Sequence, residues 1–250
     1  SGGHGGGNQF RDYSYETDYL PVIQAVHGDT RLKQVRRLVS QVTEGLDEKV
    51  KDRFGKALDV DIVLYLGLCN GAGWATSLGG REKVLLGIEK IMELNWTSLK
   101  DLQGLVYHEL GHLYHSQHGI FYQIPQEGPQ RFVWQLFTEG VAMCFEQMLV
   151  GDWKFYQDDK RGWRTWCEEN YTAILCDFDK ELPTMSHENQ RYFGDWVDYH
   201  DHGDTGYFLG AKWVQSLLQH HSFQEVIQFP LDSVCGFYKV HVKEAVSYTH

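Results

Sequence analysis

The sequence contains no run of about 18 apolar residues, the length that a helix needs to cross a bilayer. Cysteine is also scarce, and its five residues are irregularly spaced without a CxxC pair. An odd number at such spacings does not indicate a disulfide framework or a cysteine-rich zinc site. We therefore expect no membrane span, and we expect reduced thiols at Cys69, Cys144, Cys167, Cys176 and Cys235.

Positively charged residues are also fewer than negatively charged ones. Lysine and arginine number 23 against 34 aspartates and glutamates, which gives a formal net charge of -11. So acidic a chain is a poor candidate for binding nucleic acid or an anionic membrane. Hydrophobic residues make up 42% and charged residues 23% of the 250 residues, which is the composition of a folded protein and not of a disordered one.

The first residues, SGGHGGG, lack the apolar stretch of a signal peptide. We expect residues 1–9 to be a cloning remnant or disordered, and residues 10–250 to form a single domain. The expected location is the cytoplasm, although a secretion or lipoprotein leader removed beforehand would leave no trace in this sequence.

Hydrophobic periodicity divides the chain into a mixed first half and a helical second half. Apolar residues recur every three or four positions over 32–54, which predicts an amphipathic helix. Segments 61–68 and 83–91 are rich in valine, isoleucine and leucine, and they predict two strands around a glycine-rich connection at 69–80. The expected fold class is therefore α+β with a small sheet.

Capping patterns and glycines mark the helices that follow. Ser98 and Asp101 form a capping-box pattern at the start of a helix that Gly119 ends. A second long helix is expected over about 130–150, and another around 162–178. Further helices are expected to begin at Asp204 or Thr205 and at Ser222, the last with Glu225 as its capping partner.

The string HELGH at 108–112 is an H-E-x-x-H motif on one of these predicted helices. His108 and His112 are one turn apart and project from the same face, where two imidazoles can hold one zinc ion at roughly 2.0–2.1 Å. Glu109 lies beside that face, where it can take a proton from a metal-activated water. The motif therefore predicts a Zn²⁺ site with Glu109 as general base.

A catalytic zinc ion usually has three protein ligands, so the motif requires one more. Glu139 lies in an apolar stretch of the next helix, between Phe137 and Val141, where an unpaired carboxylate would be costly to bury. His118 stands where another zincin pattern has its third histidine, but that pattern has a glycine at the position of His115. We therefore expect Glu139 to complete the site, and His115 and His118 to be exposed near the helix end.

These segments resemble the gluzincin-type zinc metallopeptidases and, more closely, the bacterial families described as predicted zinc-dependent proteases. The matching pieces are HELGH at 108–112, EGVA at 139–142 and GYFLG at 206–210, with the glycine-rich stretch before 83–91. The resemblance extends over about residues 60–235. One departure is Met143, which stands where the relatives often have an acidic residue, so the second partner of a ligand histidine is not identified.

The resemblance implies a zincin-like fold, in which a small sheet packs on the HExxH helix and a helical half supplies the third ligand. It also implies that the strand near 83–88 is the edge strand on which an extended peptide lies. The expected function is a zinc-dependent peptidase acting on a peptide or protein substrate. His108, His112 and Glu139 would hold the metal, and the oligomeric state is not indicated.

A zinc peptidase also needs a donor for the oxyanion, and Tyr207 is the first candidate because it follows Gly206 at the start of a predicted helix. His202 is the reserve candidate, and Tyr207 could instead be an ordinary core aromatic. Two other functions stay open, namely a zinc hydrolase of a non-peptide amide and a catalytically silent zinc-binding regulatory module. The intact Glu109 argues against the silent module, because metal binding does not need it.

Overall fold

The structure is a computed structural model, and it describes residues 14–67, 71–157, 159, 161–194 and 197–247. The predicted amino-terminal remnant and Cys69 lie outside these residues. The chain is α+β, with a three-stranded sheet and many helices, as expected. Within the described part, no helix is both long and apolar enough to cross a membrane.

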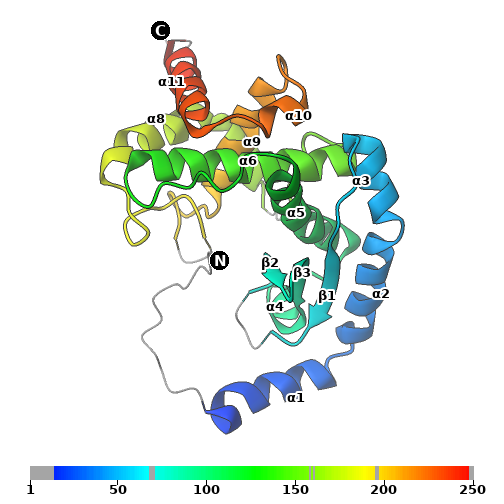
Figure 1. Cartoon of the computed structure of the whole chain (residues 1–250). Coiled ribbons are helices and arrows are strands. Elements are labelled where there is room, and N and C mark those ends of the chain that lie inside the picture. Colours follow the sequence, from blue (N-terminus) through cyan, green and yellow to red (C-terminus); the bar gives the residue numbers. More distant parts are fainter. Residues whose placement is uncertain (1–13, 68–70, 158, 160, 195–196, 248–250) are drawn as a thin grey trace.

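The long helix α5 (Leu99–His118) lies between the sheet on one side and helix α6 (Pro129–Val150) on the other (Figure 1). The predicted capping box forms at its start: the Asp101 N–H donates to Ser98 Oγ at 3.2 Å, and the Ser98 N–H donates to Asp101 Oδ2 at 3.0 Å. α6 ends at Gly151, which has a φ of 83°. Both long helices therefore begin and end close to the predicted residues.

The predicted helix over 32–54 is in fact two helices, α2 (Arg31–Thr43) and α3 (Leu46–Phe54). Gly45 between them has a φ of 64°, a left-handed conformation that glycine adopts at little cost. Both helices bury apolar residues, with α2 packed on α5 and α3 on α6. A single π-helical turn, η1 (Tyr15–Tyr19), and helix α1 (Leu20–Gly28) precede them.

The sheet has the strand order β1-β3-β2, with β1 at Asp61–Tyr65, β2 at Gly73–Leu78 and β3 at Arg81–Gly87. β3 pairs parallel with β1 and antiparallel with β2, and Gly79 and Gly80 form the turn of the β2–β3 hairpin with positive φ at both residues. Two predictions are corrected: the glycine-rich connection contains β2, and the strand near 83–88 is central and not at the edge.

Two predicted strands are also too long. β1 ends at Tyr65, and β3 ends at Gly87 because helix α4 (Ile88–Glu93) begins there. The residues after Gly87 continue the apolar run of β3, but they bury their side chains from a helix. An apolar run without alternation does not distinguish the two structures.

The carboxy-terminal half is helical, as expected. The predicted helix around 162–178 is two helices with Asn170 between them, and the capping box of Ser222 with Glu225 forms. α6 packs most extensively against α9 and α5. The elements of this half are α7 (Trp163–Glu169), α8 (Tyr171–Glu181), η2 (Leu182–Thr184), α9 (Thr205–Leu217), α10 (Phe223–Val226) and α11 (Leu231–Ser247).

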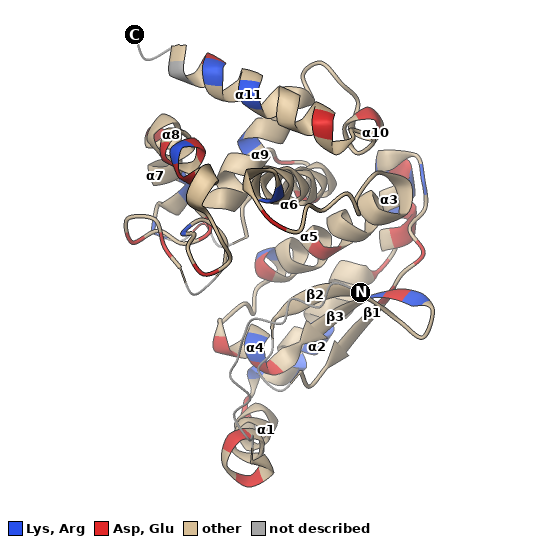
Figure 2. Ribbon diagram, turned by 60° about the vertical axis from the view of Figure 1, so that its left-hand side comes forward, with Lys and Arg blue, Asp and Glu red and all other residues tan. Residues whose placement is uncertain are grey.

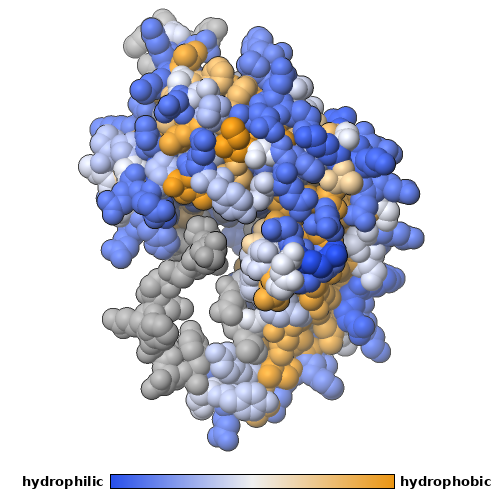
Figure 3. Space-filling model, in the orientation of Figure 1, coloured by the Kyte–Doolittle hydropathy of each residue, from blue (hydrophilic) through white to orange (hydrophobic). Residues whose placement is uncertain are grey.

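Charged residues lie mainly on the outer helices, and α6 has few of them (Figure 2). The surface in the view of Figure 3 is mostly hydrophilic, with apolar residues gathered over the sheet half below α5. Most residues of α6 are buried, and its charged residues are Arg131, Glu139 and Glu146. Carboxylates in such a helix need partners, because burying an unpaired charge is costly.

Candidate metal centre

Two histidines of α5 bring their Nε2 atoms together. His108 and His112 are one turn apart on the same face of the helix. Their ring centroids are 4.8 Å apart, and their Nε2 atoms are 3.2 Å apart. Two imidazoles with this orientation can share one cation.

Glu139 of α6 reaches both histidines. Its Oε2 atom lies 3.2 Å from Nε2 of His108 and 3.3 Å from Nε2 of His112, so the three atoms form a nearly equilateral triangle. Ligands at roughly 2.0–2.1 Å around a tetrahedral zinc ion lie roughly 3.3–3.4 Å from one another. The triangle therefore has the size of one face of such a tetrahedron. Among the described residues, no other group of histidine, cysteine and acidic side chains is arranged to hold a metal ion.

The electrostatics of the cluster favour positive charge between these atoms. Burial would raise the pKa of Glu139, but the charge of His112 and hydrogen bonds from both histidines hold it well below its ordinary value. Burial would lower the pKa of His108, but the hydrogen bond with Glu139, the neighbouring Glu146 and the nearby carboxylate charges raise it to about 10. Two imidazoles and a carboxylate are donors that suit zinc, so the residues present fit this ion.

Glycines allow the three helices of the site to approach closely. A Cβ atom on Gly111 of α5 would lie 2.7 Å from the Cα atom of Ala142 on α6. A Cβ atom on Gly140 of α6 would lie 2.3 Å from the carbonyl oxygen of Gly210 on α9. Because these are contacts with backbone atoms, a larger residue would push the helices apart. Gly111 and Gly140 thus set the spacing that lets Glu139 reach the histidines.

Glu109 lies between the His108–His112–Glu139 cluster and strand β2. A Cβ atom on Gly73 would lie 3.5 Å from Cγ of Glu109, which is an ordinary contact, and 2.8 Å from Cδ1 of Leu105, whose side chain would have to shift. Glu109 is partly exposed, and its carboxylate makes no hydrogen bond or ion pair with the residues that the structure describes. The carboxylate is therefore available for chemistry next to the cluster.

The outer edge of β2 is open next to Glu109. The Gly87 N–H donates to the carbonyl of Ala72 at 2.9 Å, which fixes the alternation of hydrogen bonds between β2 and β3. By that alternation, the backbone N–H and C=O groups of Gly73, Ala75 and Ser77 point away from β3. No strand within the described ranges pairs with this edge.

Tyr207 lies beside His108. It is in the first turn of α9, and its ring centroid is 5.7 Å from that of His108. Phe193 contacts the same tyrosine, with a centroid distance of 5.9 Å. Tyr207 is half-buried, so it borders the cluster without being enclosed in the core.

The reserve candidate, His202, is held elsewhere. Its ring stacks on that of Trp166, with 3.6 Å between the centroids and 4° between the planes. Its Nδ1 atom lies 2.7 Å from the carbonyl oxygen of His200. These contacts hold His202 against Trp166 of α7, so Tyr207 is the better candidate for a donor at the cluster.

The two later histidines of α5 are not part of the triangle of metal-binding atoms. His118 is half-buried, and its Nε2 atom lies 2.7 Å from the carbonyl oxygen of Ala57. The expectation that His115 is exposed is wrong: it is completely buried, and its ring contacts those of Phe121, Trp134 and Phe137. Burial and the charge of His112 lower the pKa of His115 to about 3, so this side chain is neutral at ordinary pH.

Sequence reasoning missed Glu146. Its Oε2 atom lies 3.7 Å from Nδ1 of His108, and its side chain is 2% exposed. Burial raises the pKa of Glu146 to about 7, although the nearby ring of His108 and its charge act in the opposite direction. A signal was present in the sequence, because Glu146 follows Glu139 by two helical turns and so lies on nearly the same face of α6.

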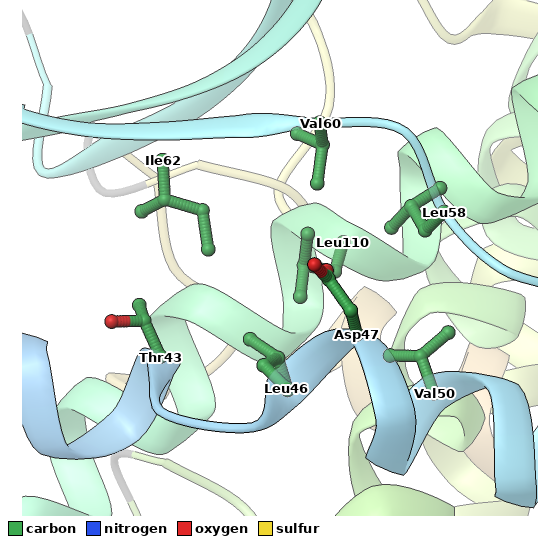
Figure 4. A pocket seen from close by; sticks show the side chains of 8 residues that line it. All are labelled: Thr43, Leu46, Asp47, Val50, Leu58, Val60, Ile62 and Leu110. Carbon is green, nitrogen blue, oxygen red and sulfur yellow. The ribbon is translucent and has the colours of Figure 1, made fainter.

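A cavity of about 230 Å³ lies on the other side of α5 (Figure 4). Leu110 of α5 is one of the residues that line it, and its side chain lies roughly 200° around the helix from that of His108. The cavity is therefore separate from the metal ligands. Six of the eight residues that line it are apolar; the eight are Thr43, Leu46, Asp47, Val50, Leu58, Val60, Ile62 and Leu110.

The cluster is defined by this chain's own residues: two histidine nitrogens and one carboxylate oxygen at zinc-ligand spacing, with Glu109 and an open strand edge beside them. No protein-family model, curated protein or solved structure gives a significant match to the chain.

Proposed function

We propose that the protein is a zinc-dependent peptidase with a zincin-like active site. The observation that carries the proposal is the triangle of Nε2 of His108, Nε2 of His112 and Oε2 of Glu139. These three residues would hold Zn²⁺, and Glu109 lies next to them on the same turn of α5.

A bound zinc ion supplies Lewis-acid chemistry, which polarises a carbonyl group and makes a water molecule more acidic. The side chains of the chain perform the proton transfers and the positioning. The Glu109 carboxylate accepts a proton from the attacking water and passes it to the nitrogen of the leaving amine. The Tyr207 hydroxyl donates a hydrogen bond to the oxyanion that develops on the carbonyl oxygen.

The open edge of β2 favours a peptide over a smaller amide as substrate. An extended peptide can add to such an edge through main-chain hydrogen bonds, and the backbone groups of Gly73 that point away from β3 lie next to Glu109. The peptide would then pass beside the metal ligands. A small amide would not use these backbone groups, and a silent regulatory module would not need the free carboxylate of Glu109.

The test combines metal analysis with a cleavage assay on the same samples. We expect the purified protein to bind one equivalent of zinc and to cleave members of a mixed peptide library, with products identified by mass spectrometry. Glu109→Gln should keep the zinc but lower turnover by about 10²–10⁴, because the ligands survive and the base is lost. Turnover that survives this change, or loss of zinc with it, would contradict the role of Glu109.

A second pair of variants tests the third ligand. Glu139→Ala should weaken zinc binding strongly, because a ligand is removed from the triangle. His118→Ala is the matched control, because this histidine lies on the same helix as the ligands but contacts Ala57. The opposite ranking in a zinc titration would exclude the proposed ligand set.

A further inference from the structure

Glu146 is a buried carboxylate behind one of the metal-binding histidines. Its Oε2 atom faces Nδ1 of His108 at 3.7 Å, on the side of the ring opposite to Nε2. Its Oε1 atom is buried and has no hydrogen-bond partner among the described residues. His108 is therefore its main polar neighbour, and Lys100 acts on it only through its more distant charge.

A carboxylate in this position is costly for the fold. Burying a charged group with few partners destabilises a protein, and an apolar residue of similar shape would often be more stable. The remainder of α6 around Glu146 is apolar or uncharged, with Phe145 and Gln147 as its buried neighbours in the chain. The contact with His108 is the feature that an apolar residue could not replace.

We propose that Glu146 is a positioning residue, which accepts a hydrogen bond from Nδ1–H of His108 and so directs the Nε2 lone pair toward His112 and Glu139. An imidazole that donates from Nδ1 has only Nε2 left to bind a metal ion. The observed separation shortens to a hydrogen bond with a shift of less than about 1 Å. The inference rests on the proposed zinc site, and it adds a residue that this site needs beyond its three ligands.

The second histidine lacks such a partner, which makes the inference specific. Nδ1 of His112 is buried and has no hydrogen-bond partner within the described residues. Loss of the carboxylate of Glu146 should therefore change the ring of His108 and leave that of His112 unchanged. A general loosening of the site would change both rings.

The experiment uses the zinc-loaded protein and two variants, Glu146→Met and Glu146→Gln. Methionine keeps the length and removes the acceptor, whereas glutamine keeps an accepting carbonyl and removes the charge. Zinc affinity, measured by competition with a chelator, should fall by about 10–100-fold in Glu146→Met and by less in Glu146→Gln. In ¹⁵N-labelled protein, the Nδ1–H signal of His108 should be lost or shifted in both variants, and that of His112 should stay in place.

Glu89→Gln is the matched control. Glu89 is also a buried glutamate, with 4% of the residue exposed, but its Oε2 atom accepts from the Gly67 N–H at 2.9 Å and not from a metal ligand. This variant removes the same charge from another buried position. It should leave both the zinc affinity and the His108 signal unchanged.

The outcomes separate this inference from the proposed function. A wild-type protein that binds no zinc overturns both. A wild-type protein that binds zinc, with affinity and His108 signal unchanged in the variants, overturns the inference alone. An equal loss of affinity in Glu89→Gln also overturns it. If Glu146→Met does not fold, Glu146→Gln decides, because an amide acceptor must shift the Nδ1–H signal of His108.

Discussion

At the scale of single residues, Tyr207 lies in a place that suits two roles. Its ring packs between those of His108 and Phe193, as an aromatic at the margin of a core would. Its position beside a metal ligand also suits a hydrogen-bond donor to the substrate. Only the hydroxyl group distinguishes the two roles, since the packing of the ring serves both.

We expect Tyr207→Phe to lower turnover by about 10²–10³ with little change in substrate binding, because removing one oxyanion donor has an effect of this size. Zinc content should stay at the wild-type level, since the hydroxyl is not a ligand. Steady-state kinetics on one cleaved peptide would measure the effect. Unchanged turnover would assign Tyr207 to the core alone.

The burial of His115 should make the stability of the fold depend on pH. Its pKa of about 3 in the folded protein lies below the value of about 6.5 for an exposed histidine. Between these values the unfolded chain binds a proton that the folded chain does not, so the free energy of unfolding falls as the pH drops from 6.5 toward 3. One such group contributes up to about 1.4 kcal/mol per pH unit.

We expect His115→Phe to remove this contribution, so that urea unfolding of the zinc-free protein depends less on pH between 7 and 5. His118→Phe is the matched control, because it changes a half-buried histidine on the same helix. If both variants keep the pH dependence of the wild type, His115 is not its source.

At the scale of elements, the site depends on helix crossings as much as on its ligands. Glu139 and Gly140 are neighbours on α6, and Gly140 touches the backbone of Gly210 on α9. Any displacement of α6 from α9 at this point also moves Glu139 relative to α5. The ligand triangle and the glycine contacts are therefore coupled.

We expect Gly140→Ala to destabilise the protein by about 1–3 kcal/mol, as overpacking against backbone atoms does, and to weaken zinc binding. Gly236→Ala on α11 is the matched control, because a Cβ atom there meets nothing within 4 Å. That change should stabilise the helix by up to about 1 kcal/mol. Urea unfolding and zinc titration of both variants would measure the difference. Equal changes in stability and in zinc affinity would contradict the role of the close contact between α6 and α9.

Sequence signals for helix ends predicted much of the element order. Both capping boxes, at Ser98 and Ser222, form where the pattern places them. The break at Gly45 was not predictable from periodicity, because the apolar residues of α2 and α3 both face the core. β2 was missed because glycines surround it, although Gly79 followed by Gly80 is itself a hairpin signal.

At the scale of the whole molecule, the proposed ion would connect the two layers that meet at α5. His108 and His112 belong to the helix that covers the sheet, and Glu139 belongs to the helix at the centre of the carboxy-terminal half. The spacing of the motif alone predicted that His108 and His112 face each other. Glu139 required the argument that a lone carboxylate in an apolar helix needs a partner.

The remaining parts of the site depend on tertiary contacts that no local pattern encodes. The contact of Glu146 with His108 requires the crossing angle of α5 and α6, and the burial of His115 requires the aromatic residues that surround it. The position of β2 beside Glu109 likewise depends on the pairing order of the sheet. The sequence therefore indicated which residues belong to the candidate site better than it indicated which side chains contact them.

We expect removal of zinc to lower the melting temperature. At a free zinc concentration of 100 times the dissociation constant, binding adds about 2.7 kcal/mol, which corresponds to about 5–10 °C in a chain of this size. Thermal unfolding with a chelator, and again after zinc is restored, would measure the shift. Glu139→Ala should show little response to either treatment. Identical melting temperatures in the wild type would contradict a metal that connects the two layers.

The order of the elements along the chain has a consequence for biosynthesis. His108 and Glu139 are separated by 31 residues, and α5 and α6 follow each other directly. Closing so short a loop costs little entropy, and domains generally acquire structure from the amino terminus as they leave the ribosome. Tyr207 and α9 emerge only later. A growing chain would therefore gain His108, His112 and Glu139 before it gains Tyr207, so that the proposed zinc site would form before the proposed peptidase site is complete.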